Sequence, residues 1–167
     1  TYTYDKSDNI TSMTDYKVNG TTVSPYRYTA YKYDKLKRVT SVTELNTKKE
    51  PSAITDEEKE QATTGYRYDI DGNLLSVSYP KSDWNVTGLK YEYDQNKWLK
   101  TIKVVTADGK EGVLRTYHYD NYGSVDGITD YRVLSKSGEL VSDPKSTTCH
   151  YTYDVCRRPA SMTYTDD

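Results

Sequence analysis

The chain has 167 residues, a length that suits one domain with a sizeable core. Its 19 Tyr and 2 Trp, with no Phe and few aliphatic residues, predict a thin sheet held by Tyr, whose ring buries apolar area while its hydroxyl needs a partner or water. The net charge is −2 with both signs interspersed, so we expect no nucleic-acid partner, and no stretch is apolar enough to be a membrane-spanning segment.

A four-residue motif, Tyr-x-Tyr-Asp, recurs along the whole chain. The six copies begin at Tyr2, Tyr31, Tyr66, Tyr91, Tyr117 and Tyr151. Side chains alternate along a strand, so the two Tyr of each copy share one face. Turn residues follow, most clearly in 69–73 and 120–123, where Asp can bond nearby amides and Gly can adopt positive φ. Each copy therefore predicts a hairpin, and the Tyr pairs predict ladders.

Second turns at Asn19-Gly20, Asp108-Gly109 and Ser137-Gly138 lie between copies and are flanked by β-formers. One strand on each side of every repeat turn gives a single all-β domain, 1–167, an antiparallel up-and-down meander of about twelve strands. The predicted strands are 1–5, 9–18, 21–34, 38–46, 64–69, 73–79, 86–94, 98–106, 111–120, 124–135, 139–154 and 159–165.

One segment breaks this pattern. Residues 51–62 contain good helix formers, and Thr55 with Glu58 has the spacing of a capping box. We expect one short helix at 55–62. Such a short helix is marginal alone, so it must pack against the sheet or fray; a lid over one end of the sheet is the functional alternative.

Two apolar residues, three positions apart, follow each repeat turn. The pairs are Ile10/Met13, Val39/Val42, Leu74/Val77, Leu99/Ile102, Val125/Ile128 and Pro159/Met162. In a regular strand this spacing places the pair on opposite faces. Either a bulge follows each turn, or both faces of the sheet are partly covered.

The run from Tyr66 to Leu74, Tyr-Arg-Tyr-Asp-Ile-Asp-Gly-Asn-Leu, resembles the tyrosine-aspartate (YD) repeat of the Rhs proteins. The resemblance covers all six copies, although the turn Gly is kept only at Gly72 and Gly123 and the copies are spaced more widely than is usual for that family. The loose repeats look still more like those of uncharacterised secreted lipoproteins of gut Bacteroidetes, whose fold is described as a soluble porin-like barrel.

This resemblance implies a closed or nearly closed porin-like barrel, and closure would remove the exposed edges of a meander. An open, curved, single-layer YD-repeat sheet is the alternative; pairing of residues 1–5 with 159–165 distinguishes the two. The implied function is a non-enzymatic scaffold or binding module that is secreted, periplasmic or at the cell surface. A glycan-binding or glycan-active protein, or a fragment of a Rhs-type encapsulating shell, are alternatives.

Catalytic chemistry has few candidates. His118 and His150 occupy repeat positions filled elsewhere by Thr, Lys, Arg or Glu, and Cys149 and His150, being adjacent, point to opposite faces of a strand. No zinc spacing is present. We expect no catalytic residues, metal or cofactor, and we expect Cys149 and Cys156 to be reduced because their positions in a hairpin suit a disulfide poorly. The repeat Asp residues are interpreted as turn braces.

Aromatic side chains are the best candidates for ligand binding, with carbohydrate or another surface protein as the partner. Trp84 lies in a predicted loop, and Tyr rings can stack on sugars. The Tyr candidates are Tyr66, Tyr68, Tyr91, Tyr93, Tyr117 and Tyr119. The structural alternative is that they are cross-strand pairs that hold the sheet together.

Overall fold

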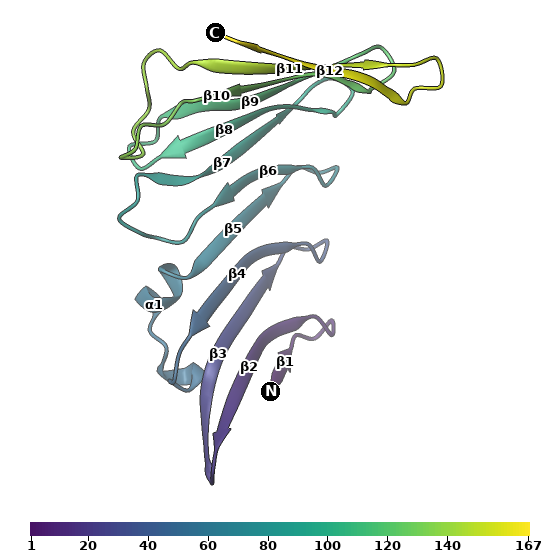
Figure 1. The fold of residues 1–167 in the computed structure, drawn as a ribbon. Coiled ribbons are helices and arrows are strands. Elements are labelled where there is room, and N and C mark those ends of the chain that lie inside the picture. Colours follow the sequence, from purple (N-terminus) through teal and green to yellow (C-terminus); the bar gives the residue numbers. More distant parts are fainter. The chain divides into compact units, whose positions relative to one another are not determined.

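The computed structural model describes residues 1–167, which form twelve antiparallel strands that follow one another in chain order (Figure 1). The chain divides into two compact units, residues 1–83 and 84–167, and each is described by itself. The predicted all-β meander of about twelve strands is confirmed, whereas a single domain stays a prediction.

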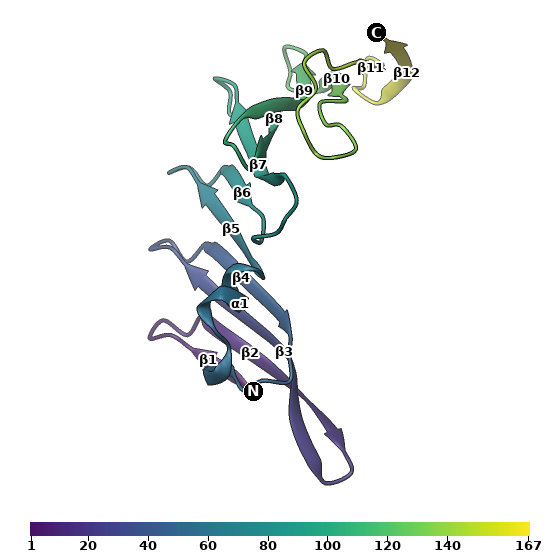
Figure 2. The ribbon, with the colours of Figure 1, turned by 90° about the vertical axis from the view of Figure 1, so that its left-hand side faces the viewer.

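The first unit contains six strands, a 3₁₀ turn and a short helix. They are β1 (Tyr2–Tyr4), β2 (Ile10–Asn19), β3 (Thr22–Tyr33), β4 (Val39–Asn46), η1 (Pro51–Ala53), α1 (Asp56–Glu60), β5 (Thr63–Tyr68) and β6 (Leu74–Ser78). β2 and β3 continue past their neighbours as a two-stranded hairpin that ends at the predicted Asn19-Gly20 turn (Figure 2).

The second unit contains the other six strands. They are β7 (Val86–Tyr93), β8 (Leu99–Thr106), β9 (Glu111–Tyr119), β10 (Val125–Tyr131), β11 (Ser146–Tyr153) and β12 (Pro159–Asp166). Each strand pairs antiparallel with the next one along the chain.

The predicted barrel closure is wrong. β1 pairs with β2 alone and β12 pairs with β11 alone, so residues 1–5 do not pair with 159–165 and the sheet is not closed by hydrogen bonds. The open-sheet alternative is therefore correct. The physical reason is visible in the pairing: every ladder is a local antiparallel one, and nothing in a local ladder requires the two end strands to meet.

Every Tyr-x-Tyr-Asp hairpin contains a β-bulge. The pairing register shifts just before the second Tyr, and the extra residue lies on the partner strand. In the second copy, Tyr31 lies opposite Val42 and Tyr33 opposite Val39, with Thr40 as the extra residue. The bulge thus brings both apolar residues to the Tyr face, which decides between the two explanations for their spacing. The register shift recurs in all six copies, within the pairs β1–β2, β3–β4, β5–β6, β7–β8, β9–β10 and β11–β12.

The second Tyr of a hairpin also joins it to the hairpin before. The Tyr33 hydroxyl donates to the carbonyl oxygen of Ile10 at 2.8 Å. Tyr119 donates in the same way to Leu99 at 2.7 Å, and Tyr153 donates to Val125 at 2.7 Å. The acceptor in each case is the first apolar residue of the preceding hairpin. A half-buried ring therefore has a partner for its polar end, as Tyr needs.

The helix at 55–62 is confirmed in shortened form as α1, and the predicted capping box is present. The Thr55 side chain accepts from the Glu58 amide, and the Glu58 carboxylate accepts from the Thr55 amide. The helix ends at Glu60, and the Ala62 carbonyl accepts from the Glu44 amide of β4. Ile54, just before it, is buried, so the segment packs against the sheet rather than fraying.

The predicted strands 124–135 and 139–154 are too long. β10 ends at Tyr131, β11 begins at Ser146, and residues 132–145 form a loop with one bridge, between Leu134 and Leu140. Pro144 has no amide hydrogen and cannot donate to a ladder. The loop instead packs on the sheet, where Val133 joins a buried cluster with Val86 and Val104.

A close approach of backbone and side chain holds this loop in place. A Cβ on Gly112 would lie 2.5 Å from the Leu140 Cδ2 atom, so a larger residue at this point of β9 would require the leucine side chain to move. The side chains of Val104 and Leu140 thus both approach the position that a side chain at residue 112 would occupy.

The hydroxyl link between hairpins makes a testable prediction. Tyr33→Phe should lower the free energy of unfolding by about 1 kcal/mol because it removes one hydrogen bond and leaves the ring in place. Tyr31→Phe is the matched control, being a half-buried Tyr on the same strand with no hydrogen bond from its hydroxyl. Urea unfolding measures both, and equal effects of the two substitutions would contradict the link.

Candidate functional site

The repeat Asp closes its own turn in every copy. The Asp120 carboxylate accepts from the amides of Tyr122 and Ser124 at 2.9 and 3.0 Å. The amide four residues after the Asp donates in the same way in all the other copies, to Asp5, Asp34, Asp69, Asp94 and Asp154. This geometry supports the interpretation that these carboxylates are turn braces.

The residue three positions after each repeat Asp has a positive φ. Gly72 and Gly123 adopt it, as their sequence positions predict, but the other four copies place a side chain there at φ 61–64°: Asp8, Lys37, Lys97 and Arg157. This conformation is costly for a residue with a Cβ.

Two of these side chains reach back to the preceding turn. Arg157 donates to the Asp120 carboxylate at 2.7 Å, and its guanidinium lies 4.2 Å from the centre of the Tyr122 ring. Lys37 donates to the carbonyl of Ser7 at 3.4 Å. Contacts between neighbouring turns therefore offset part of the backbone strain.

The turn hydrogen bonds lower the pKa of several repeat aspartates. The Asn9 and Asn73 side chains hold the pKa of Asp5 and of Asp69 below the ordinary value, and the Arg158 amide does so for Asp154. Burial alone would raise the pKa of Asp34 and Asp120, but hydrogen bonds outweigh it and lower both. The carboxylates are therefore held ionised, as turn braces rather than as proton donors.

The predicted Tyr candidates all lie half-buried in the ladders, each opposite one apolar residue. The pairs are Tyr66–Val77, Tyr68–Leu74, Tyr91–Ile102, Tyr93–Leu99, Tyr117–Ile128 and Tyr119–Val125. Three rings have further contacts: the Arg38 guanidinium lies 4.9 Å from the centre of the Tyr68 ring, the Arg115 guanidinium lies 5.9 Å from that of Tyr117, and Tyr119 packs on Trp98. The structural alternative for these residues therefore has direct support.

Trp84, the remaining predicted candidate, is 56% exposed. Its ring lies beside Gly138 at the tip of the 132–145 loop, and the neighbouring Asn85 side chain donates to the Gly138 carbonyl at 3.0 Å. Next to it is a cavity of about 360 Å³ lined by Asn85, Thr106, Asp108, Lys110, Glu139 and Leu140.

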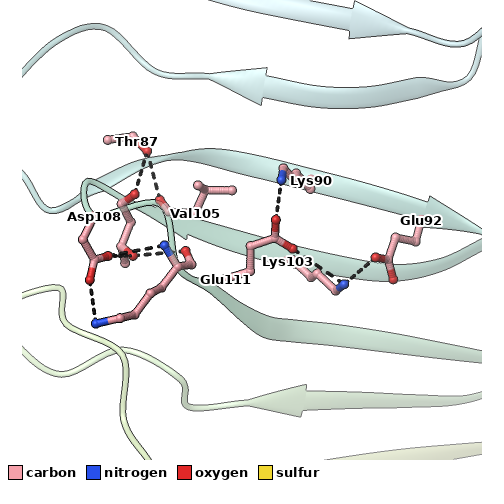
Figure 3. Close-up of polar contacts among 9 residues, drawn as sticks. Thr87, Lys90, Glu92, Lys103, Val105, Asp108 and Glu111 are labelled. Carbon is pink, nitrogen blue, oxygen red and sulfur yellow. Dashed lines mark hydrogen bonds and ion pairs between the residues drawn. The ribbon is translucent and has the colours of Figure 1, made fainter.

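Two of the three charged side chains in this cavity form an ion pair. Lys110 contacts Asp108 at 2.7 Å and, with a hydrogen bond from Thr106, holds the pKa of Asp108 at about 2 (Figure 3). Asp108 raises the pKa of Lys110, and Glu139 adds to this effect. Sequence reasoning treated Asp108 only as a turn residue and missed the cavity, because it forms only when the 132–145 loop folds back.

A second charged cluster lies across β7, β8 and β9 (Figure 3). Lys90 pairs with Glu111, and Lys103 pairs with Glu92 and also lies 3.7 Å from Glu111. Lys90 and Lys103 stand directly opposite each other, so the two glutamates separate like charges. This cluster is a polar sheet face and suggests no chemistry.

A cavity recurs between neighbouring hairpins, at the repeat turns. One of about 420 Å³ lies between the fourth and fifth copies, and its lining includes Trp98, Tyr117, His118 and Tyr119. Another, of about 500 Å³, lies between the first and second copies. Tyr117 and Tyr119 are thus brought together in a cavity, but one that belongs to the repeat geometry.

Trp98 was missed as a candidate. It stands four residues after its repeat Asp, where other copies have Asn, Arg or Ser, and that departure was a signal. A Cβ on Gly123 would come within 2.6 Å of the Trp98 ring, so this ring seals the contact between two turns.

The remaining chemical candidates stay apart. No three or more His, Cys, Asp and Glu side chains gather to hold a metal ion. Cys149 is buried and Cys156 is exposed, and both are free, as predicted. His118 and His150 are exposed. None of the helices is long and apolar enough to cross a membrane.

Comparison with known proteins shows the fold. No family model and no curated protein matches the sequence. The structure is similar to part of a mutant Tc holotoxin pore of Photorhabdus luminescens, with a TM-score of 0.53 and 16% identity over 99% of this chain and 9% of that one. A crystal structure of TcdB2-TccC3-Cdc42 matches with a TM-score of 0.44 and 14% identity, over 98% and 10% of the two chains.

This chain thus spans about a tenth of the length of the solved chains it matches. At such low identity the likeness establishes the fold alone, and that fold fits the resemblance to Rhs-type YD repeats.

The lowered pKa values predict a loss of stability in acid. Each affected carboxyl has a folded-state pKa below its ordinary value of 3.8, so its contribution is present above that value and is lost as pH falls through the folded-state pKa. The free energy of unfolding should therefore be level from pH 7 to 5 and fall below about pH 4.

Asp120→Asn sharpens this test, because the amide oxygen can keep both backbone hydrogen bonds but carries no charge. We expect Asp120→Asn to have a shallower acid dependence than the unmodified chain in urea unfolding from pH 7 to 2.5. An acid dependence left unchanged by Asp120→Asn would contradict the conclusion that the Asp120 carboxylate stabilises its turn in ionised form.

Proposed function

We propose that this chain is a non-enzymatic structural segment of a YD-repeat scaffold, namely a fragment of a Rhs-type encapsulating shell. One observation carries the proposal: every member of the repeat motif has a structural partner. The first Tyr packs on an apolar residue, the second Tyr packs likewise and in several copies also bonds the hairpin before, and the Asp closes the turn. The similarity to part of a Tc holotoxin pore supports the same role.

An extracytoplasmic location, whether secreted, periplasmic or at the cell surface, is part of this proposal and rests on the resemblance to Rhs-type repeats. Membership of the secreted lipoprotein group rests on the sequence resemblance alone. The open sheet gives no support to the porin-like barrel of that group.

A panel of glycoside, ester and peptide substrates tests the absence of catalysis. We expect no turnover above that of the heat-unfolded chain. Asp108 and Glu139 are the carboxylates that line the cavity beside Trp84, so they are the groups to vary. Turnover that disappears in Asp108→Asn or Glu139→Gln, but not in the exposed control Asp143→Asn, with melting temperatures unchanged, would overturn the proposal.

A glycan-binding role is the second candidate, and the surroundings of Trp84 favour it. An exposed indole face beside a cavity lined by an amide, two carboxylates and an ammonium group offers both stacking and hydrogen bonding to a sugar. The half-buried ladder Tyr residues offer no comparable exposed face.

Glycan-array binding followed by calorimetry tests this role. If a glycan binds, Trp84→Ala should weaken it about tenfold or more, the equivalent of 1.4 kcal/mol. Tyr26→Ala is the control, because Tyr26 is an equally exposed aromatic residue of the other unit. The role is excluded if no glycan binds or if both variants bind as the unmodified chain does.

A further inference from the structure

A second cavity lies next to the cavity beside Trp84. The cavity beside Trp84 is the polar cavity, and the second, of about 390 Å³, is the apolar cavity. Both belong to the second unit, and the 132–145 loop lines both. Apart from Glu111 and Thr116, the wall of the apolar cavity is formed mostly by Val113, Tyr131, Val133, Leu140, Val141 and Pro144. A concave, largely apolar cavity with few polar groups is the common form of a small-ligand site.

Two segments of the chain pass directly from one cavity to the other. In the loop, Glu139 lines the polar cavity, Val141 lines the apolar cavity, and Leu140 lines both. At the start of β9, Lys110 lines the polar cavity and Glu111 lines the apolar one (Figure 3). Consecutive Cα atoms are about 3.8 Å apart, so the cavities are adjacent and the Leu140 side chain is the wall between them.

Hydrogen bonds hold this wall in position. The Val141 amide donates to the Val133 carbonyl at 2.8 Å, and the Glu139 carbonyl accepts from the Ser135 amide at 2.9 Å. The Leu140 side chain lies over Gly112, where no side chain competes for the space. The loop therefore presents the two cavities side by side in one arrangement.

The chemistry of the two cavities is complementary. The polar cavity offers an amide, two carboxylates and an ammonium group beside the exposed indole of Trp84. In the apolar cavity the one charged residue, Glu111, is already paired with Lys90 and lies 3.7 Å from Lys103, so a ligand there would make chiefly apolar contacts. A molecule that suits both cavities has a sugar at one end and an apolar group at the other.

We propose that the two cavities form one site for an alkyl glycoside. The sugar lies in the polar cavity against Trp84, and the alkyl chain passes Leu140 into the apolar cavity. This proposal rests on the glycan-binding role proposed above for the surroundings of Trp84, and it adds the part of the ligand beyond the sugar. The alkyl chain supplies affinity through burial of apolar surface, and the sugar supplies orientation through hydrogen bonds.

Calorimetry with matched glycosides tests the proposal on the full chain. The probes are the octyl and methyl glycosides of glucose, galactose and maltose, used below the concentrations at which the octyl forms make micelles. We expect the octyl form to bind at least about tenfold more tightly than the methyl form of the same sugar, since each buried methylene strengthens binding about fourfold. In a series from butyl to dodecyl chains, affinity should rise and then level off when the apolar cavity is full.

Substitutions separate the two halves of the site. Val141 is 39% exposed, so Val141→Asn places an amide in the apolar wall at a position that tolerates it. It should remove most of the octyl advantage and leave the methyl glycoside unaffected. Trp84→Ala should weaken both forms by a similar factor. Val18→Asn is the control, because Val18 is an exposed valine of the other unit, and melting temperatures check folding.

The outcomes distinguish this proposal from the glycan-binding role. Methyl and octyl forms that bind equally, and that Trp84→Ala weakens, would leave the glycan-binding role standing and overturn the alkyl site. An octyl advantage that Val141→Asn and Val18→Asn affect alike, or that grows with chain length without levelling off, belongs to nonspecific adsorption and overturns it as well. Octanol that binds as tightly as the octyl glycosides also overturns it, because the sugar then contributes nothing. If no glycoside binds, both proposals fall.

Discussion

The one-residue bulge before the second Tyr is the constraint on which the rest of the sheet depends. Without it, Val39 and Val42 would lie on opposite faces, and one of the two Tyr rings of the hairpin would lose its apolar partner. With it, two rings and two apolar side chains share one face of the hairpin. The chain can therefore hold its sheet together with few aliphatic residues, because both apolar residues of each pair lie on the face that carries the Tyr rings.

The use of Tyr in place of Phe follows from this single-faced arrangement. The second Tyr of a hairpin is half-buried and keeps its hydroxyl near the preceding hairpin, where a Phe ring could not donate to the backbone carbonyl. The Tyr33–Ile10 bond and its equivalents turn a row of separate hairpins into an array of nearest neighbours. The turns strengthen the array when a cation such as Arg38 or Arg157 spans two of them.

The sequence predicted what local signals determine. The hairpins, the Asp turns and the Thr55–Glu58 capping box each depend on residues within a few positions, and all are present. The bulges remained open because a spacing of three is compatible with two arrangements. The predicted 139–154 strand was too long because the Ser137-Gly138 turn forms but closes only one bridge, between Leu134 and Leu140. Val133 instead packs into the cluster with Val86 and Val104, and such packing joins strands far apart in sequence. Closure was wrong because it depends on the two end strands, which no local pattern describes.

The candidate site residues also divide into those that a local pattern predicts and those that it does not. The ladder Tyr residues were identified from the motif. Their contacts show why the same motif recurs in each copy within this chain: its residues form the hairpin. Differences between hairpins must then come from positions that vary between copies. The residue four after the repeat Asp is Trp98 in one hairpin and Arg38 in another, and it decides whether neighbouring turns meet through a ring or a guanidinium. Because the Tyr and Asp residues are constant and the turn residues vary, one hairpin can differ from the next while the Tyr ladder that stabilises both is kept.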